Sequence, residues 1–129
     1  MTMGLVSPRL SVPKHIKAPE YVGRPSPTPF TGSDVKTPEQ IEKIRDAGKI
    51  AAGAIEMLRP EIVPGVSTDY LDKLAHEYVI DHGAYPSTLG YRGYPKSICS
   101  SVNEIICHGI PDDTVLESGD IVNIDITAY

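Results

Sequence analysis

The spacing of apolar and polar residues first predicts a helix that begins after Thr37. Thr37 suits the N-cap, Pro38 suits the first helical position, and Gln40 can complete a capping box. The helix should end before Pro60, because a residue that precedes proline avoids helical backbone angles. Apolar residues recur every three or four positions along it, which is typical of an amphipathic helix; they are Ile41, Ile44, Ala47, Ala51, Ile55 and Leu58.

A second helix is predicted from Ser67 or Thr68 to Gly83, because the N-cap residue types come first and glycine commonly ends a helix. His76 and His82 fall off its apolar face, so both are predicted to be solvated surface histidines rather than ligands. That face is formed by Leu71, Leu74, Ala75, Tyr78 and Val79.

Short runs separated by glycine and proline follow Tyr85. Residues 97–102 and 105–108 are predicted to be extended, with a turn at 103–104, and residues 121–127 are predicted to form a buried strand. Two amphipathic helices followed by strands predict the α+β class, with the helices packed on one face of a mostly antiparallel sheet.

Length and charge narrow the possible functions. A chain of 129 residues is long enough for one domain with a real core. Its net charge of −5 argues against nonspecific binding to nucleic acid through the whole domain. No apolar run approaches the roughly 20 residues that span a membrane, and the N-terminus lacks the apolar core of a secretory signal. We therefore expect a cytoplasmic protein.

Residues 1–36 are predicted to form a proline-rich, basic N-terminal extension ahead of a domain at 37–129. Seven of the 12 prolines lie at or before Pro38, and residues 24–30 should be close to polyproline II. Two interpretations stay open: a segment packed along the domain surface, or an arm that binds a partner. Residues 1–33 carry a net charge of +3, from Arg9, Lys14, Lys17 and Arg24 against Glu20.

Asp125 and His108 are the first candidates for chemistry. Asp125 lies between Ile124 and Ile126, and a carboxylate inside a buried strand needs a cation, hydrogen-bond donors or a metal as its partner. His108 lies between an apolar run and Gly109, so its imidazole is predicted to project from a strand end into a cleft. The two are predicted to form two walls of one active site.

The two cysteines, Cys99 and Cys107, are predicted to be reduced thiols rather than a disulfide. A spacing of seven residues with no second cysteine or histidine pair is also a poor zinc-finger signature. Taken alone, such thiols are interpreted as small buried hydrophobic residues.

Three stretches, at residues 89–97, 103–112 and 119–125, resemble the type I methionine aminopeptidases, in the order in which that family carries them. The resemblance covers residues 37–129. It implies the pita-bread fold, of which this chain would supply the N-terminal half. It also implies removal of the initiator methionine from nascent proteins and peptides by hydrolysis that depends on two divalent ions, Co, Mn, Fe or Zn.

The resemblance also implies roles for particular residues. Asp125 matches a metal ligand, and His108 matches a catalytic histidine that contacts the substrate near the scissile amide and is not a metal ligand. Arg92 lies at a variable position on the pocket rim. The pocket for the methionine side chain would be lined by Tyr91, Tyr94, Cys99 and Cys107.

Only the first of the five metal ligands of the family falls within this chain, so the chain is interpreted as the front portion of an enzyme. By itself it is expected to be inactive. The alternatives are a noncatalytic module that binds peptides or proteins, and an inactive truncated fragment. The expected partners are the N-terminal methionine of nascent polypeptides and, through the N-terminal arm, the ribosome, with no membrane and no specific nucleic acid.

Overall fold

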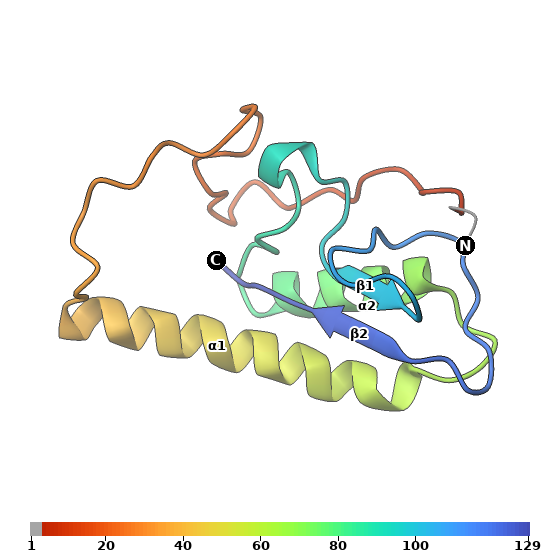
Figure 1. Ribbon diagram of the computed structural model, residues 1–129. Helices are drawn as coiled ribbons and strands as arrows, with labels where there is room; N and C mark the ends of the chain where they lie inside the picture. The colour runs from red at the N-terminus through yellow and green to blue at the C-terminus, as the bar shows by residue number, and fades with distance from the viewer. Residues whose placement is uncertain (1–3) are drawn as a thin grey trace.

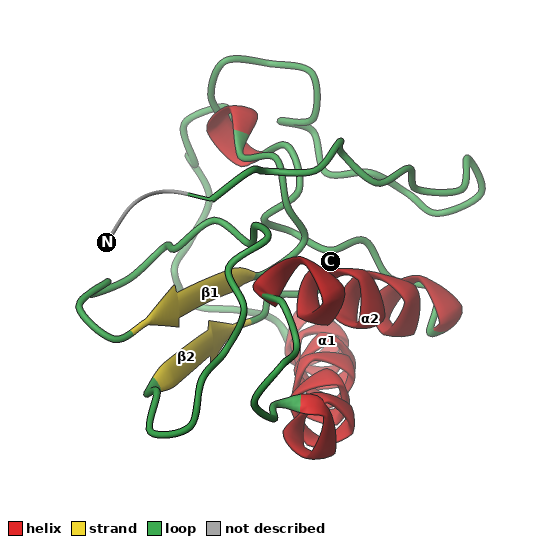
Figure 2. Ribbon diagram, turned by 90° about the vertical axis from the view of Figure 1, so that its right-hand side faces the viewer, coloured by secondary structure: helices red, strands yellow, loops and turns green. Residues whose placement is uncertain are grey.

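The computed structural model describes residues 4–129. It contains two α-helices, α1 (Pro38–Leu58) and α2 (Thr68–Asp81), two 3₁₀ helices, η1 (Arg59–Glu61) and η2 (Tyr91–Gly93), and two strands, β1 (Cys99–Val102) and β2 (Val122–Asp125). The strands pair antiparallel, and both α-helices lie on one side of the sheet (Figures 1 and 2). These elements agree with the predicted α+β class. None of the helices within residues 4–129 combines the length and the apolar character that crossing a membrane requires.

The predicted N-terminal ends of both helices are confirmed. The Thr37 hydroxyl accepts from the Gln40 amide, and the Gln40 side chain accepts from the Thr37 amide, which completes the capping box of α1. Ser67 caps α2 by accepting from the Tyr70 amide at 3.2 Å. Each bond satisfies an amide that the first turn of a helix would otherwise leave unpaired.

The predicted apolar stripe of α1 is buried only near its C-terminal end. Leu58 is the one member of the stripe that is fully buried, whereas Ile41, Ile44 and Ile55 are exposed. No described element packs over the first turns of the helix (Figure 1). The core lies between the end of α1, α2 and the sheet. Its buried members are Ala54, Leu58, Leu71, Ala75, Val79, Ala84, Ile98, Val102, Leu116 and Ile126.

The prediction that His76 lies on the surface is wrong. His76 is only 4% exposed; one ring nitrogen lies 2.7 Å from the Ser97 hydroxyl, and the other lies 3.1 Å from the Ser11 carbonyl oxygen. His76 is buried against two polar groups, a serine hydroxyl and a backbone carbonyl, so a stripe defined by hydrophobicity could not reveal it. His82, in contrast, is exposed as predicted.

Two extended segments differ from the prediction. Residues 105–108 form a loop rather than a strand, and His108 has a positive φ of 55°, which ends any extended run. Asp125 is in a strand, as predicted, but it is exposed rather than buried. The positions of β2 alternate between half-buried and exposed, and the exposed face has no described element over it.

The N-terminal segment packs along the domain surface over residues 4–22; the first three residues of the predicted extension lie outside the described part of the chain. The Gly4 amide donates to Asp112, and Lys96, only 1% exposed, is hydrogen-bonded to Ser7 and paired with Asp69. Farther along the segment Ile16 is buried against Tyr85 and Leu89. Residues 28–35 are exposed.

A buried carboxylate joins α2 to the chain just before β1. Asp72 is 1% exposed, and its Oδ1 accepts from the amides of Ser97 at 2.8 Å and Ile98 at 3.0 Å. Burial raises the pKa of Asp72 from 3.8 to about 6, against the lowering effect of these amides and of Lys96. Because the folded state holds this proton more tightly than the unfolded state, the carboxyl lowers stability as pH rises from about 4 through about 6.

We predict that Asp72→Asn stabilises the protein near neutral pH, because an amide oxygen can still accept from Ser97 and Ile98 without burying a charge. The expected gain in free energy of unfolding is roughly 1 to 3 kcal/mol at about pH 7.5, and it should shrink toward zero below about pH 4. Urea unfolding at both pH values measures it. Asp81→Asn, at an exposed position of the same helix, is the matched control. A loss of stability at neutral pH in Asp72→Asn would contradict this account.

Candidate functional site

Five of the six predicted site residues border one cleft of about 890 Å³. They come from separate parts of the chain. Tyr91 begins the η2 turn and Tyr94 follows it, whereas Cys99 begins β1 and Asp125 ends β2. His108 comes from the loop that follows β1. A volume of this size is within the range of small-molecule and peptide-end sites.

Strand pairing brings two of these residues together. Cys99 lies directly opposite Asp125 in the antiparallel register of β1 and β2. Beyond Asp125 the chain pairs with a different segment, where the Ser87 amide donates to the Thr127 carbonyl oxygen at 2.9 Å. The chain after β2 therefore lies along residues 85–87, and this pair of segments forms one side of the cleft.

Tyr94 connects the two walls of the cleft. Its hydroxyl donates to the Gly109 carbonyl oxygen at 2.8 Å and also lies 3.2 Å from the Ile98 carbonyl oxygen, so it ties the loop that carries His108 to the chain just before β1. Burial raises the pKa of Tyr94 far above its ordinary value, and the neighbouring Cys99 raises it further. Tyr94 therefore remains a neutral hydrogen-bond donor at every physiological pH.

Gly109 fixes the position of His108. The Ser100 amide donates to the Gly109 carbonyl oxygen at 2.9 Å, and the Gly109 amide donates to the Ser101 hydroxyl at 3.1 Å. A Cβ at residue 109 would lie 2.1 Å from the Ser100 carbonyl oxygen, a distance that no side chain tolerates. Only glycine allows the loop to approach β1 this closely.

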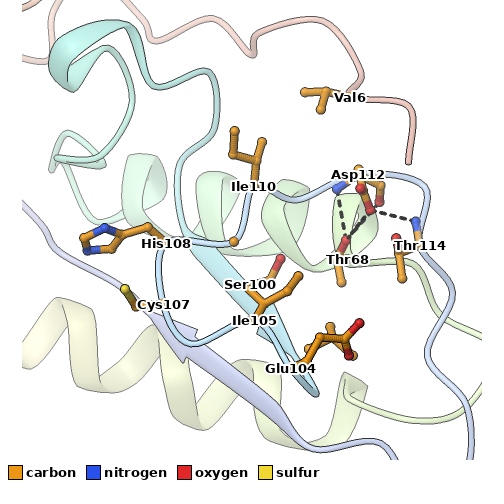
Figure 3. A pocket seen from close by; sticks show the side chains of 12 residues that line it. Val6, Thr68, Ser100, Glu104, Ile105, Cys107, His108, Ile110, Asp112 and Thr114 are labelled. Atoms are coloured by element: carbon orange, nitrogen blue, oxygen red, sulfur yellow. Dashed lines mark hydrogen bonds between the residues drawn. The ribbon is translucent and has the colours of Figure 1, made fainter. Parts of the chain in front are cut away.

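The two cysteines occupy different places. Burial raises the pKa of the Cys99 thiol, so Cys99 stays protonated and lines the cleft rather than acting as a nucleophile. Cys107 is exposed and borders a second cavity of about 400 Å³, which His108 also borders (Figure 3). The structure therefore does not bring Cys107 into the cleft with the other predicted residues. Both thiols are free, as predicted.

The side chains present do not by themselves fit a metal centre. Within residues 4–129 no group of three or more histidine, cysteine, aspartate or glutamate side chains is placed to hold a metal ion. Asp125 is the one carboxylate at the cleft, among the residues that the structure places there. One carboxylate is too few donors for tight binding of a divalent ion.

Tyr21 is a cleft residue that the sequence reasoning missed. It belongs to the N-terminal segment, is half-buried, and borders the same cleft as Tyr91 and Asp125. The only signal for it was an aromatic residue within a polar, proline-rich stretch, which did not distinguish a cleft wall from ordinary surface packing. Arg92, noted for the pocket rim, also borders the cleft.

Residues 42–129 match the family model described as metallopeptidase family M24. The chain belongs to this family. Membership implies the fold of a metallopeptidase. The matched region includes every predicted site residue and begins after the N-terminal segment with Tyr21.

Individual relatives within family M24 support the predicted resemblance to methionine aminopeptidases. Methionine aminopeptidase 2 of Mycobacterium tuberculosis is 58% identical over 129 residues, which is 100% of this chain and 45% of that relative. The methionine aminopeptidase of Escherichia coli is 55% identical over 95 residues, covering 72% of this chain and 36% of that relative. The chain thus spans less than half the length of these curated relatives, and the predicted resemblance is confirmed.

Solved structures of the family show the same fold. The methionine aminopeptidase of Rickettsia prowazekii aligns with a TM-score of 0.72 at 44% identity, covering 74% of this chain and 38% of that one. The enzyme of Thermotoga maritima aligns with a TM-score of 0.72 at 40% identity, covering 74% of this chain and 39% of that one. The predicted fold, part of the pita-bread arrangement of α+β class, is confirmed.

We predict that Gly109→Ala lowers the free energy of unfolding by roughly 2 kcal/mol or more, because the new methyl group forces the His108 loop away from β1. Gly48→Ala is the matched control, since a Cβ at this position within α1 meets nothing within 4 Å. The control should gain up to about 1 kcal/mol from helix propensity. Urea unfolding measures both variants. Equal stability of the two variants would show that the loop does not need this close approach.

Proposed function

We propose that this chain forms the N-terminal half of a methionine aminopeptidase domain that removes the initiator methionine from nascent proteins and peptides by metal-dependent hydrolysis. The observation that supports the proposal is the single cleft shared by Tyr91, Tyr94, Cys99, His108 and Asp125. An aromatic, sulfur-lined surface and two polar side chains thus meet in one place. The activity is assigned to the complete protein, and the 129-residue chain by itself is expected to be inactive.

The substrate pocket in this proposal accepts the methionine side chain. Tyr91 and Tyr94 offer aromatic rings and Cys99 offers a protonated thiol, and both kinds of group suit a thioether. Burying a methionine side chain contributes about 1.5 to 3 kcal/mol. Cys107 remains part of the proposal as a lining residue, although it borders the neighbouring cavity.

His108 and Asp125 carry the polar part of the proposal. His108 is exposed at the cleft, held by a loop that Gly109 and Tyr94 tie to β1, so its imidazole is available to hydrogen-bond the substrate near the scissile amide. We assign Asp125 as a metal ligand. The two divalent ions of the proposal, Co, Mn, Fe or Zn, need further ligands that residues 4–129 do not supply.

The proposal also covers the division of the chain, its partners and its location. We assign residues 1–36 to an N-terminal extension and residues 37–129 to the peptidase domain. The partners are nascent polypeptides with an N-terminal methionine, and the basic extension is available for contact with the ribosome. A cytoplasmic location suits this substrate and the two free thiols.

A noncatalytic module that binds peptides is the second candidate. The observation in its favour is the lack of a metal-binding cluster among the described residues, together with an intact aromatic cleft. The complete protein distinguishes the two functions. Such a module would bind a methionine-initiated peptide without releasing methionine, whatever metal is added.

We predict that the complete protein releases methionine from the peptide Met-Gly-Met when Mn, Co or Fe is added, and that a chelator abolishes the release. The 129-residue chain, purified and verified by mass, should release none, because a single carboxylate cannot hold the required metal. Chromatographic measurement of free methionine tests both expectations. Release by the 129-residue chain would contradict the ligand argument, and binding without release by the complete protein would favour the second candidate.

We predict that Asp125→Asn in the complete protein abolishes activity and lowers the metal content. His108→Ala should lower turnover by about 10²- to 10³-fold while the metal content stays the same, because His108 contacts substrate rather than metal. The control is His82→Ala, at the exposed C-cap position of α2. Activity assays paired with metal analysis measure these effects. Loss of metal in His108→Ala would overturn the role assigned to it.

A further inference from the structure

Tyr21 lies outside the family segment and yet reaches the cleft. It is part of the N-terminal segment that runs beside the η2 turn (Figure 1). Its side chain is half-buried and borders the cleft together with Tyr91, Tyr94 and Asp125. The segment therefore adds a wall to the cleft as well as covering the domain surface.

Two contacts hold the Tyr21 side chain in this position. Its hydroxyl donates to the Ser87 carbonyl oxygen at 2.5 Å. Its ring meets the Tyr91 ring edge to face, with centroids 5.2 Å apart and an interplanar angle of 87°. This geometry is favourable for an aromatic pair, because the positive edge of one ring meets the negative face of the other.

Each contact leads to a group that shapes the cleft. Tyr91 is 42% exposed at the η2 turn, and its ring contacts Tyr21 and the Arg92 guanidinium, which lies 5.7 Å from the ring centroid. Ser87 accepts from Tyr21 through its carbonyl oxygen and donates to Thr127 through its amide. Thr127 follows Asp125 by two residues, so Tyr21 supports both the aromatic side of the cleft and the segment beyond the carboxylate.

The N-terminal segment is itself well anchored on both sides of Tyr21. Ile16 is 6% exposed and packs against Tyr85 and Leu89. A turn at 19–22 is closed by the Val22 amide, which donates to the Pro19 carbonyl oxygen, and the Arg24 amide donates to the Tyr21 carbonyl oxygen at 2.9 Å. Tyr21 is thus presented to the cleft by fixed backbone.

We propose that Tyr21 is a positioning residue of the substrate cleft, which holds the Tyr91 ring in place and thereby sets the affinity for the first side chain of the substrate. The inference rests on the proposed function, since it takes methionine as the occupant of the cleft. It assigns to the N-terminal segment a part in substrate recognition. Tyr21 acts through Tyr91 and the Ser87 backbone, and takes no part in bond cleavage.

Kinetics of the complete protein on Met-Gly-Met give the first test. Tyr21→Ala should raise KM by about 3- to 10-fold with kcat changed less than about 2-fold. The Tyr91 ring contacts the methionine side chain equally in the bound substrate and in the transition state, so its displacement weakens binding and leaves the chemical step unchanged. Tyr21→Phe keeps the ring and should restore most of the affinity. Tyr70→Ala removes an exposed tyrosine from α2 and is the matched control. An unchanged KM in Tyr21→Ala, or a fall in kcat alone, would overturn the proposal.

A second measurement does not depend on catalysis. L-methionine is titrated into the 129-residue chain with labelled tyrosine rings, and the Tyr91 ring signals are followed by NMR. In Tyr21→Ala these signals should move before any methionine is added, and the methionine affinity should fall by the same factor as in the kinetics. Unmoved Tyr91 signals with unchanged affinity, or no methionine binding by the unsubstituted chain, would overturn the inference. An inactive complete protein with these NMR results intact would overturn only the proposed activity.

Discussion

The cleft depends on the hydrogen bonds that leave the two edges of β1. Successive residues of a strand direct their backbone groups to opposite sides. On one side β1 pairs with β2, which sets Asp125 opposite Cys99; on the other side the Ser100 amide holds the Gly109 carbonyl oxygen beside His108. One short strand thus fixes the separation between the carboxylate and the imidazole. Both residues are exposed, which leaves their side chains available to a substrate or a cofactor.

Behind β1 the fold uses a polar layer where an apolar one would be usual. Asp72 accepts from the backbone that leads into the strand, His76 lies against Ser97, and Lys96 is buried beside Asp69 and Ser7. Buried polar groups of this kind lower stability unless each finds a partner. Here the partners come from α2 and from the N-terminal segment together. That arrangement attaches the segment to the peptidase fold and brings Tyr21 to the cleft.

Much of the local structure followed from the sequence, because its causes are local. The capping residue Thr37, the helix-ending Gly83 and the turn at Asn103 depend on a few neighbouring residues, and the structure has each of them. His76 and Tyr21 could not be placed in the same way, since their partners lie 21 and 66 residues away in the chain. The exposure of Asp125 also escaped prediction, because an apolar sequence pattern does not tell whether a further layer covers the strand. The grouping of His108 with Asp125 was anticipated from their residue types and from the family resemblance.

We propose above all that, in the complete protein, this cleft receives the N-terminal methionine of a substrate. A crystal structure of the complete protein with bound L-methionine tests it most directly. The account predicts the thioether between Tyr91 and Tyr94 and near Cys99, with the amino and carboxyl groups of methionine directed toward Asp125 and His108. Methionine bound elsewhere, or a cleft that stays empty at saturating methionine, would contradict the account.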